Sequence, residues 1–322
     1  MVKKLAATVA LALMLPMGGA TFAHAAPAAA TIDRAERVND TQTRLFVHSP
    51  AMDRLVQVQV LHPAQEGSRP TLYLLDGVSA GEESEFREST WTQRTDIEEF
   101  FADKNTNVVL PVGGTASYYT DWNDSDPVLG VNKWETFLTE ELPPLIDARF
   151  GGNGVNAVAG LSMGATGAMS LITRNPDLYE GVAALSGCYD TSQDSSRDSV
   201  RGTIAYKGGN PDNMWGPPED AAWEEHDSYL LAERLRGKKI FLSTGNGLLG
   251  PHDIGTEQDV LTVGAPLEIG TFVCTITYDR RLRELGIPAQ VVYRPWGTHS
   301  WGYWQDDIKA AWPTLADALG LR

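Results

Sequence analysis

The segment that most constrains the fold is AVAGLSMGATGA at residues 157–168, which contains the pattern Gly-x-Ser-x-Gly centred on Ser162. A short apolar stretch precedes it, and a helical stretch that ends before Pro176 follows it. A serine on a sharp turn between strand and helix projects its hydroxyl above the sheet, while the glycines keep side chains away from it. The pattern therefore predicts a nucleophile at Ser162. The alternative is a helix N-cap serine in a glycine-rich turn.

Strand and helix patterns alternate along the chain. Residues 44–62 alternate in polarity like two antiparallel strands joined by a turn at 50–53. Further strands are expected at 71–77, 107–114, 181–187, 238–245 and 289–295, and helices at 95–103, 134–150 (with a break near Pro143), 275–286 and 301–320. Such alternation indicates a mainly parallel sheet with helices on both faces, and we predict an α/β-hydrolase fold.

The first 25 residues have the pattern of a signal peptide. Lys3 and Lys4 precede an apolar run over residues 5–15, and Ala23-His24-Ala25 resembles a cleavage site. The run is shorter than the ~20 residues that a membrane span needs. We therefore expect export with cleavage after Ala25, and no later membrane span. Residues 26–43 are expected to form an N-terminal segment, and residues 44–322 a single catalytic domain.

A long segment at residues 188–237 separates two of the predicted strands and carries Trp215 and Trp223. Insertions of this length often form lids or binding surfaces, which makes it a candidate acceptor or acyl-chain site. The two tryptophans are expected to pack the insertion onto the body of the domain.

Charge and motif content exclude several classes of function. The formal net charge is −16, so a nucleic-acid partner is not expected, because such binding depends on Lys and Arg. The sequence has neither an HExxH motif nor paired CxxC motifs, and its glycine clusters lack the P-loop and dinucleotide patterns. We predict no metal and no cofactor, and we expect a monomer.

The histidine of a hydrolase triad follows the nucleophile and the acid in chain order and lies after the last strand. Among the six histidines, only His299 in RPWGTHSW meets that requirement, since the others lie in the signal peptide, before Ser162, in the insertion or directly after the strand at 238–245. His299 is the predicted general base.

The triad acid is not fixed by chain order. It must be a carboxylate that accepts from the imidazole N–H and stabilises the imidazolium. Four carboxylates follow the strand at 238–245: Asp253, Glu257, Asp259 and Glu268. All four remain open at this point, and most of them are expected to be surface residues.

An oxyanion hole needs two backbone N–H donors. The residue after the nucleophile, Met163, supplies one, and the loop LLDGVSA after an early strand is expected to supply the other from Val78. The alternative for that loop is a simple glycine turn.

The chain has two cysteines, Cys188 and Cys274. An exported protein meets oxidising conditions, so a disulfide between them is one possibility and two free thiols are the other. Sequence alone leaves this open, although both positions are expected to border the active site.

Several motifs, in order, resemble the mycolyltransferases of the antigen 85 type: YLLDG, PVGGTASYYTDW, KWETFLTEELP, GLSMG, DNMWGPPEDAAWEEHD, GNG and GTHSW. The resemblance covers residues 49–320. It implies the triad Ser162, Glu268 and His299, with Glu268 in GAPLEIG as the acid. It also implies oxyanion amides at Val78 and Met163, a sugar-binding Asp76, and Trp301 beside the sugar.

The resemblance further implies acyl transfer from trehalose monomycolate to a second trehalose monomycolate or to cell-wall arabinogalactan, with association with outer envelope lipid. A secreted carboxylesterase and a non-catalytic envelope-binding protein are the alternatives. Two positions depart from the family pattern: Ser79 replaces an arginine that contacts trehalose, and Gly164 replaces an alanine. The second change is expected to be sterically mild.

Overall fold

The computed structural model describes residues 29–255, 258 and 260–322, so the predicted signal peptide, Glu257 and Asp259 lie outside the described residues. One sheet runs through the described part of the chain in the order β1-β2-β3-β5-β4-β6-β7-β8-β9. Its strands are β1 (Thr31–Asn39), β2 (Gln42–Ser49), β3 (Arg54–Leu61), β4 (Arg69–Leu75), β5 (Asn107–Val112), β6 (Gly152–Leu161), β7 (Tyr179–Leu185), β8 (Lys239–Thr244) and β9 (Gln290–Tyr293). The strands from β5 to β9 are parallel, and β1, β2 and β3 extend the sheet in antiparallel fashion.

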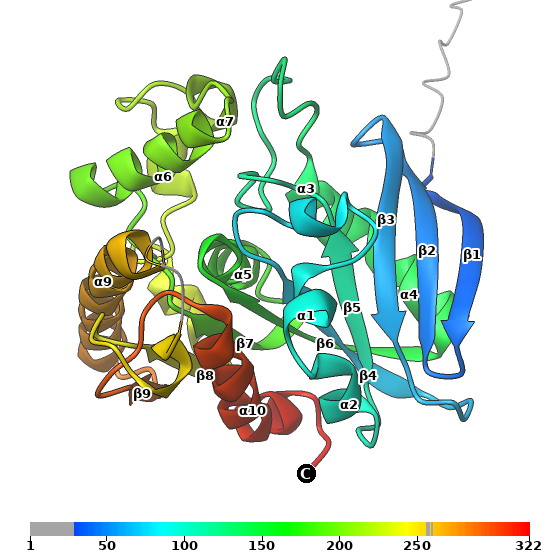
Figure 1. Cartoon of the computed structure of the whole chain (residues 1–322). Helices are drawn as coiled ribbons and strands as arrows, with labels where there is room; N and C mark the ends of the chain where they lie inside the picture. The colour runs from blue at the N-terminus through cyan, green and yellow to red at the C-terminus, as the bar shows by residue number, and fades with distance from the viewer. Residues whose placement is uncertain (1–28, 256–257, 259) are drawn as a thin grey trace, which may run out of the picture.

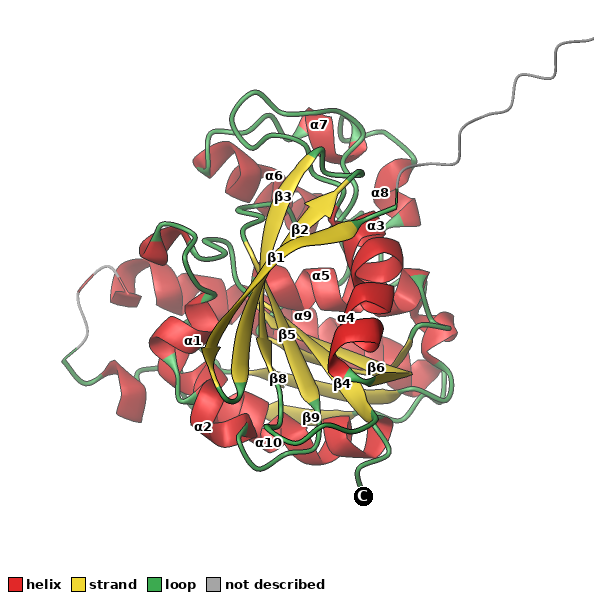
Figure 2. Ribbon diagram, turned by 90° about the vertical axis from the view of Figure 1, so that its right-hand side faces the viewer, coloured by secondary structure: helices red, strands yellow, loops and turns green. Residues whose placement is uncertain are grey.

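Helices cover both faces of this sheet (Figures 1 and 2). They are α1 (Thr90–Arg94), α2 (Ile97–Phe101), α3 (Trp134–Thr136), α4 (Leu142–Phe150), α5 (Met163–Arg174), α6 (Asp194–Tyr206), α7 (Asp212–Trp215), α8 (Ala222–Glu225), α9 (Ala265–Glu284) and α10 (Trp301–Ala318). Short 3-10 turns are η1 (Glu82–Ser84), η3 (Ala232–Leu235) and η4 (Pro251–Asp253), and π turns are η2 (Phe137–Glu141) and η5 (Val260–Gly264).

The side-chain alternation of the central strands divides the core into two layers. In β4, Tyr73 and Leu75 pack in the layer that contains α4 and α5, while Leu72 and Leu74 pack in the layer that contains α1, α2 and α10. Both faces of the strand are buried, as its continuous apolar sequence requires. The predicted α/β-hydrolase fold is confirmed.

The N-terminal part of the sheet begins earlier than predicted. β1 pairs with β2 in antiparallel register, so the sheet extends into the segment at 26–43, in front of the predicted domain start at residue 44. The sequence signal was weak because β1 is an edge strand with mostly exposed, polar side chains.

Two predicted helices differ from the observed ones. Residues 134–150 are helical throughout, without the predicted break near Pro143, and the π turn η2 ends at Glu141, two residues before that proline. Pro143 is tolerated because it lies in the first turn of α4. α9 begins at Ala265, ten residues before the predicted start at residue 275, so Glu268 lies on a helix.

The insertion at 188–237 is helical and packs against the body of the domain. Trp215 and Trp223 are both 1% exposed and contact each other edge to face, with ring centroids 5.0 Å apart. The expected packing role of these two tryptophans is confirmed.

One helix in the described part of the chain, Leu261–Glu284, is long and apolar enough to cross a membrane by length and composition. The expectation that no segment after the signal peptide reaches that length is therefore wrong. The helix carries Glu268, whose side chain is fully buried against the rest of the fold.

Candidate active site

Ser162 lies at the turn between β6 and α5 with a left-handed backbone, φ 53° and ψ −121°. Such a conformation is strained for a residue with a side chain and is typical of a nucleophile elbow. The turn closes tightly: a Cβ on Gly160 would lie 2.3 Å from the Gly164 carbonyl oxygen, and a Cβ on Gly164 would lie 2.3 Å from the Asp76 carbonyl oxygen. Gly164 leaves the elbow intact, as expected, and the space around it in this chain leaves no room for the Cβ of an alanine.

Ser162, His299 and Glu268 form a continuous hydrogen-bonded chain. The Ser162 Oγ lies 2.7 Å from His299 Nε2, and His299 Nδ1 lies 2.8 Å from Glu268 Oε2. An ionised carboxylate only accepts hydrogen bonds, so Nδ1 carries the ring proton and Nε2 accepts from the serine hydroxyl. This arrangement can deprotonate a serine and stabilise the imidazolium that results.

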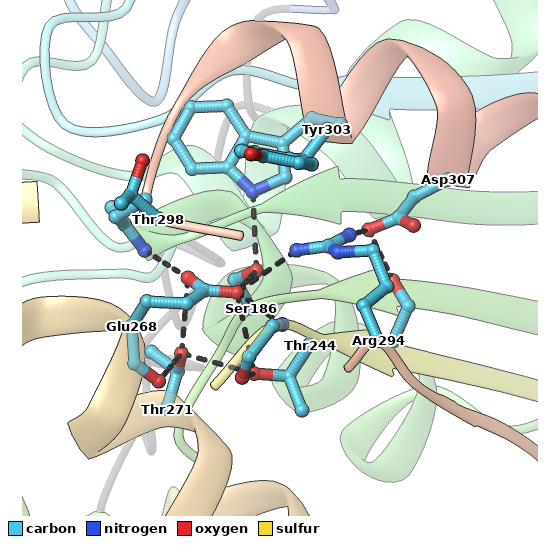
Figure 3. Close-up of polar contacts among 12 residues, drawn as sticks. Ser186, Thr244, Glu268, Thr271, Arg294, Thr298, Tyr303 and Asp307 are labelled. Atoms are coloured by element: carbon cyan, nitrogen blue, oxygen red, sulfur yellow. Dashed lines mark hydrogen bonds and ion pairs between the residues drawn. The ribbon is translucent and has the colours of Figure 1, made fainter. Parts of the chain in front are cut away.

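The Glu268 carboxylate lies at the carboxyl ends of three strands (Figure 3). Its Oε1 accepts from Ser186 Oγ at 2.8 Å, from the Gly245 backbone N–H at 2.5 Å and from Arg294 Nη2 at 3.0 Å. Burial alone would raise the pKa of Glu268, but the interactions with His299, Gly245 and Arg294 outweigh it and hold the pKa below its ordinary value. Glu268 is therefore ionised, as the triad chemistry requires.

Arg294 lies between two buried carboxylates. It bonds Glu268 through Nη2 and Asp307 on α10 through Nη1, and Asp307 also accepts from Ser243 Oγ at 2.8 Å (Figure 3). The guanidinium thus compensates the negative charges of Glu268 and Asp307. The groups that surround Glu268 were not predicted from the sequence. A signal was present, because Ser186, Ser243 and Arg294 all occur at the ends of predicted strands, where ligand-binding and catalytic groups collect in parallel sheets.

Asp253, one of the open acid candidates, has a different role. It is 6% exposed and accepts from Thr298 Oγ1 at 2.5 Å and from Tyr303 OH at 2.5 Å. It therefore fixes the loop that carries His299. The expectation that most of the four candidates are surface carboxylates does not hold for Asp253 or for Glu268.

The predicted oxyanion residues lie near Ser162: Met163 follows it in the chain, and Val78 lines the same cavity as Ser162. Met163 is the first residue of α5, so its N–H has no acceptor within the helix and points along the positive end of the helix dipole. Val78 follows Gly77, where an added Cβ would lie 3.8 Å from Ser162 Cβ. Among the described residues, neither N–H donates to another protein group. Their role as donors to a substrate carbonyl oxygen stays a prediction.

A small cavity opens at Ser162. Its volume is about 100 Å³, and its lining includes Val78, Ser79, His299, Trp301 and Trp304. The Trp301 indole contacts Trp304 edge to face at 5.4 Å, so its ring is fixed at the cavity wall. Within the described chain, the insertion at 188–237 contributes none of the side chains that line this cavity, and its role as an acceptor or acyl-chain site stays a prediction.

Asp76 lies behind the cavity wall. Its side chain is fully buried and accepts from the backbone N–H groups of Thr90 at 3.0 Å and Trp91 at 3.2 Å. Burial raises the pKa of Asp76 to about 7, although these hydrogen bonds oppose the shift. In this arrangement Asp76 joins the start of α1 to the loop that carries Val78, and contact with a sugar stays a prediction.

Cys188 and Cys274 form a disulfide, with their Cα atoms 5.0 Å apart. Cys188 follows Ser186 by two residues, and Cys274 lies on α9 six residues after Glu268. The bond therefore joins two segments that meet at the Glu268 carboxylate.

Comparison with known proteins shows the family to which the chain belongs. Residues 49–315 match the family described as "Putative esterase". The diacylglycerol acyltransferase/mycolyltransferase Ag85A of Mycobacterium tuberculosis is 35% identical over 288 residues, covering 86% of this chain and 81% of the relative. The chain belongs to the antigen 85 family. A second antigen 85 relative, Ag85B of Mycolicibacterium smegmatis, is 34% identical over 289 residues, covering 86% of this chain and 85% of that protein.

Solved structures share the fold of this antigen 85 chain. MPT51 (FbpC1) of Mycobacterium tuberculosis superposes with a TM-score of 0.72 at 26% identity, covering 85% of this chain and 97% of that one. The serine hydrolase FphF of Staphylococcus aureus has a TM-score of 0.64 at 19% identity, covering 85% and 98%, which shows the shared fold alone. The resemblance to the antigen 85 family expected from the motifs is confirmed.

Proposed function

We propose that this chain is an exported acyltransferase that moves a mycolyl group from trehalose monomycolate, through an acyl-enzyme on Ser162, to a second trehalose monomycolate or to arabinogalactan. The observation that carries the proposal is the hydrogen-bonded chain from Ser162 through His299 to the buried Glu268, in a member of the antigen 85 family. Export rests on the predicted signal peptide, with cleavage after Ala25.

The first half-reaction forms the acyl-enzyme. Ser162 Oγ attacks the ester carbonyl carbon while its proton passes to His299 Nε2, and the carbonyl oxygen becomes an oxyanion held by the N–H groups of Val78 and Met163. The bond from the carbonyl carbon to the sugar oxygen then breaks. The departing trehalose oxygen takes the proton from His299, which leaves the acyl group on Ser162.

The second half-reaction reverses these steps with another hydroxyl. His299 removes the proton of an acceptor sugar hydroxyl, whose oxygen attacks the acyl carbon, and Ser162 leaves with its proton restored. Water competes with the acceptor at this point. Trp301 and Trp304 form an apolar wall beside Ser162, and a sugar seated against that wall would occupy the volume that a hydrolytic water needs.

A carboxylesterase is the second candidate, because the same triad can pass the acyl group to water and because the family that matches is an esterase family. Incubation of purified protein with trehalose monomycolate, followed by mass analysis of the products, distinguishes the two functions. The proposal expects trehalose dimycolate and free trehalose as the main products. Free mycolic acid with no dimycolate would establish the esterase instead.

A further inference from the structure

A second cavity lies on the antiparallel side of the sheet, between β3, the loop after β5 and the segment before α3. Its volume is about 660 Å³, within the ~300–1,000 Å³ of typical small-ligand sites. Among the residues that the structure describes, none lines both this cavity and the cavity at Ser162. We call it the β3 cavity, and its lining includes Arg34, Arg54, Leu55, Phe86, Val128 and Lys207.

Three cationic side chains line the β3 cavity: Arg34, Arg54 and Lys207. Arg34 pairs with Glu36 at 3.0 Å. Lys207 pairs with Glu82, which also lines the cavity. In the part of the chain that the structure describes, Arg54 has no carboxylate partner. Of the three positive charges, that of Arg54 is therefore left uncompensated.

The Arg54 guanidinium is partly buried in the wall of the cavity. Its Nη1 donates to the Val131 carbonyl oxygen at 2.8 Å, and its central carbon lies 5.9 Å from the centroid of the Trp134 ring. Burial lowers the pKa of Arg54, but an arginine stays charged in proteins. Because buried charges are normally paired, this cation indicates an anion that comes from outside the chain.

Two backbone N–H groups belong to the same wall. Gly114 and Thr115 line the cavity, and within the described chain neither N–H donates to a protein group. Gly114 has φ 89°, and a Cβ there would lie 2.8 Å from Trp134 Cε2, so this part of the wall is bare backbone. A guanidinium and free backbone N–H groups are the donors that carboxylate and phosphate oxygens accept.

The β3 cavity also has an apolar part. Leu55, Phe86 and Val128 line it and are 44%, 46% and 66% exposed. Phe86 has a left-handed backbone, φ 58°, held by a hydrogen bond from its N–H to the Gly81 carbonyl oxygen at 2.9 Å. Strained residues of this kind occur often at ligand clamps. The cavity thus places a cationic wall beside exposed apolar side chains.

We propose that the β3 cavity binds an amphipathic oxyanion, a carboxylate or phosphate group on an apolar chain, with the oxyanion on Arg54 and the chain against Leu55 and Phe86. Long-chain acids and phosphorylated lipids share this chemistry. A neutral sugar would leave the charge of Arg54 uncompensated, and an inorganic anion would leave the apolar side chains in water. Binding here requires no turnover and does not depend on the transferase function proposed above.

Titration calorimetry of the full mature protein with decanoate and with decyl phosphate tests the site, and the tighter ligand identifies the head group. Arg54→Gln should weaken binding of that ligand at least tenfold, because it removes the uncompensated cation. Arg236→Gln is the matched control, since Arg236 is an exposed arginine outside the β3 cavity, and it should bind like wild type.

A second pair of variants tests the site at an exposed position, where folding is not at risk. Leu55→Glu adds a negative charge to the wall and should weaken binding of the anion at least tenfold. Leu55→Gln has a similar size without the charge and should cause a smaller loss. Turnover of a soluble short-chain ester should stay within twofold of wild type in all these variants, because none of the substituted residues lines the cavity at Ser162.

Several outcomes would overturn the proposal. Failure of both decanoate and decyl phosphate to bind contradicts it. Binding that is unchanged in Leu55→Glu would place the ligand elsewhere, the cavity at Ser162 included. Decyl maltoside that binds as tightly as the anions would show an apolar groove without selectivity for charge. Acetate or inorganic phosphate that binds as tightly as its decyl counterpart would show that the apolar side chains take no part.

Discussion

Glu268 reaches His299 from the first turn of helix α9, with its Oε2 2.8 Å from the imidazole Nδ1. The neutral amide in Glu268→Gln can still contact the ring but does not stabilise the imidazolium. We expect turnover of a soluble ester to fall by about 10⁴-fold, the scale known for the equivalent acid-to-amide change in a serine protease.

Two further amide variants make that result specific. Glu284→Gln, on an exposed position of the same helix, should leave turnover unchanged. Asp253→Asn should loosen the His299 loop through its bond to Thr298 and cause a smaller loss. A larger loss in Asp253→Asn than in Glu268→Gln would contradict the assignment of the triad acid.

Arg294 is predicted to stabilise the fold through the two carboxylates that it joins. Arg294→Gln leaves the buried Asp307 without its cation, and breaking such a pair costs about 3–5 kcal/mol in the free energy of unfolding. The double variant Arg294→Gln/Asp307→Asn should recover part of that loss, because it removes the uncompensated charge. Chemical denaturation of the two single variants and the double variant measures the coupling between Arg294 and Asp307. Strictly additive losses in the free energy of unfolding would show that there is none.

Asp76 should make stability depend on pH. Its pKa is raised to about 7 in the folded protein, from an ordinary value near 4 in the unfolded chain. The folded state therefore binds the extra proton between these values, and the contribution of Asp76 to stability falls as the pH rises from about 4 to 7. Asp76→Asn lacks this titration. The free energy of unfolding of the variant minus that of wild type should therefore be larger at pH 8 than at pH 5. Denaturation curves at both pH values check this, and an equal difference at the two would contradict it.

The disulfide should stabilise both the fold and the position of Glu268. It closes a loop across a sequence separation of 86, and removal of native disulfides typically costs about 2–4 kcal/mol. We expect Cys188→Ser/Cys274→Ser to unfold at lower denaturant concentration and to turn over a soluble ester more slowly, because α9 is then free to shift. Unchanged stability in the double variant would exclude a structural role for the bond.

Local patterns in the sequence predicted the central strands, the elbow and the order of the triad, because each depends on contiguous residues. The Gly-x-Ser-x-Gly pattern specifies a turn, and GTHSW lies in the loop after the last strand. Chain order did not identify the triad acid, because four carboxylates follow the strand at 238–245. Glu268 lies on a part of α9, from Ala265, that was not predicted to be helical. The segment does not show the usual amphipathic pattern of a surface helix, because Leu267, Ile269 and Val273 are exposed while Glu268 and Thr275 are buried.

Groups that act through tertiary contacts were not predictable from sequence. Ser186 follows β7, Arg294 follows β9 and Asp307 lies on α10. They come together because the carboxyl ends of the neighbouring parallel strands β7, β8 and β9 lie side by side and α10 packs next to them. The clash that an alanine at 164 would cause also depends on a distant partner, the carbonyl of Asp76.

The most direct test of the proposed mechanism is the site of acyl attachment. Wild-type protein is mixed with trehalose monomycolate, quenched with acid and digested, and the peptides are weighed by mass spectrometry. The mechanism predicts the acyl mass on the peptide that contains Ser162, its absence in Ser162→Ala, and a loss of turnover of about 10⁴-fold or more in that folded variant. Dimycolate formation without an adduct on Ser162, or with turnover retained in Ser162→Ala, would contradict it.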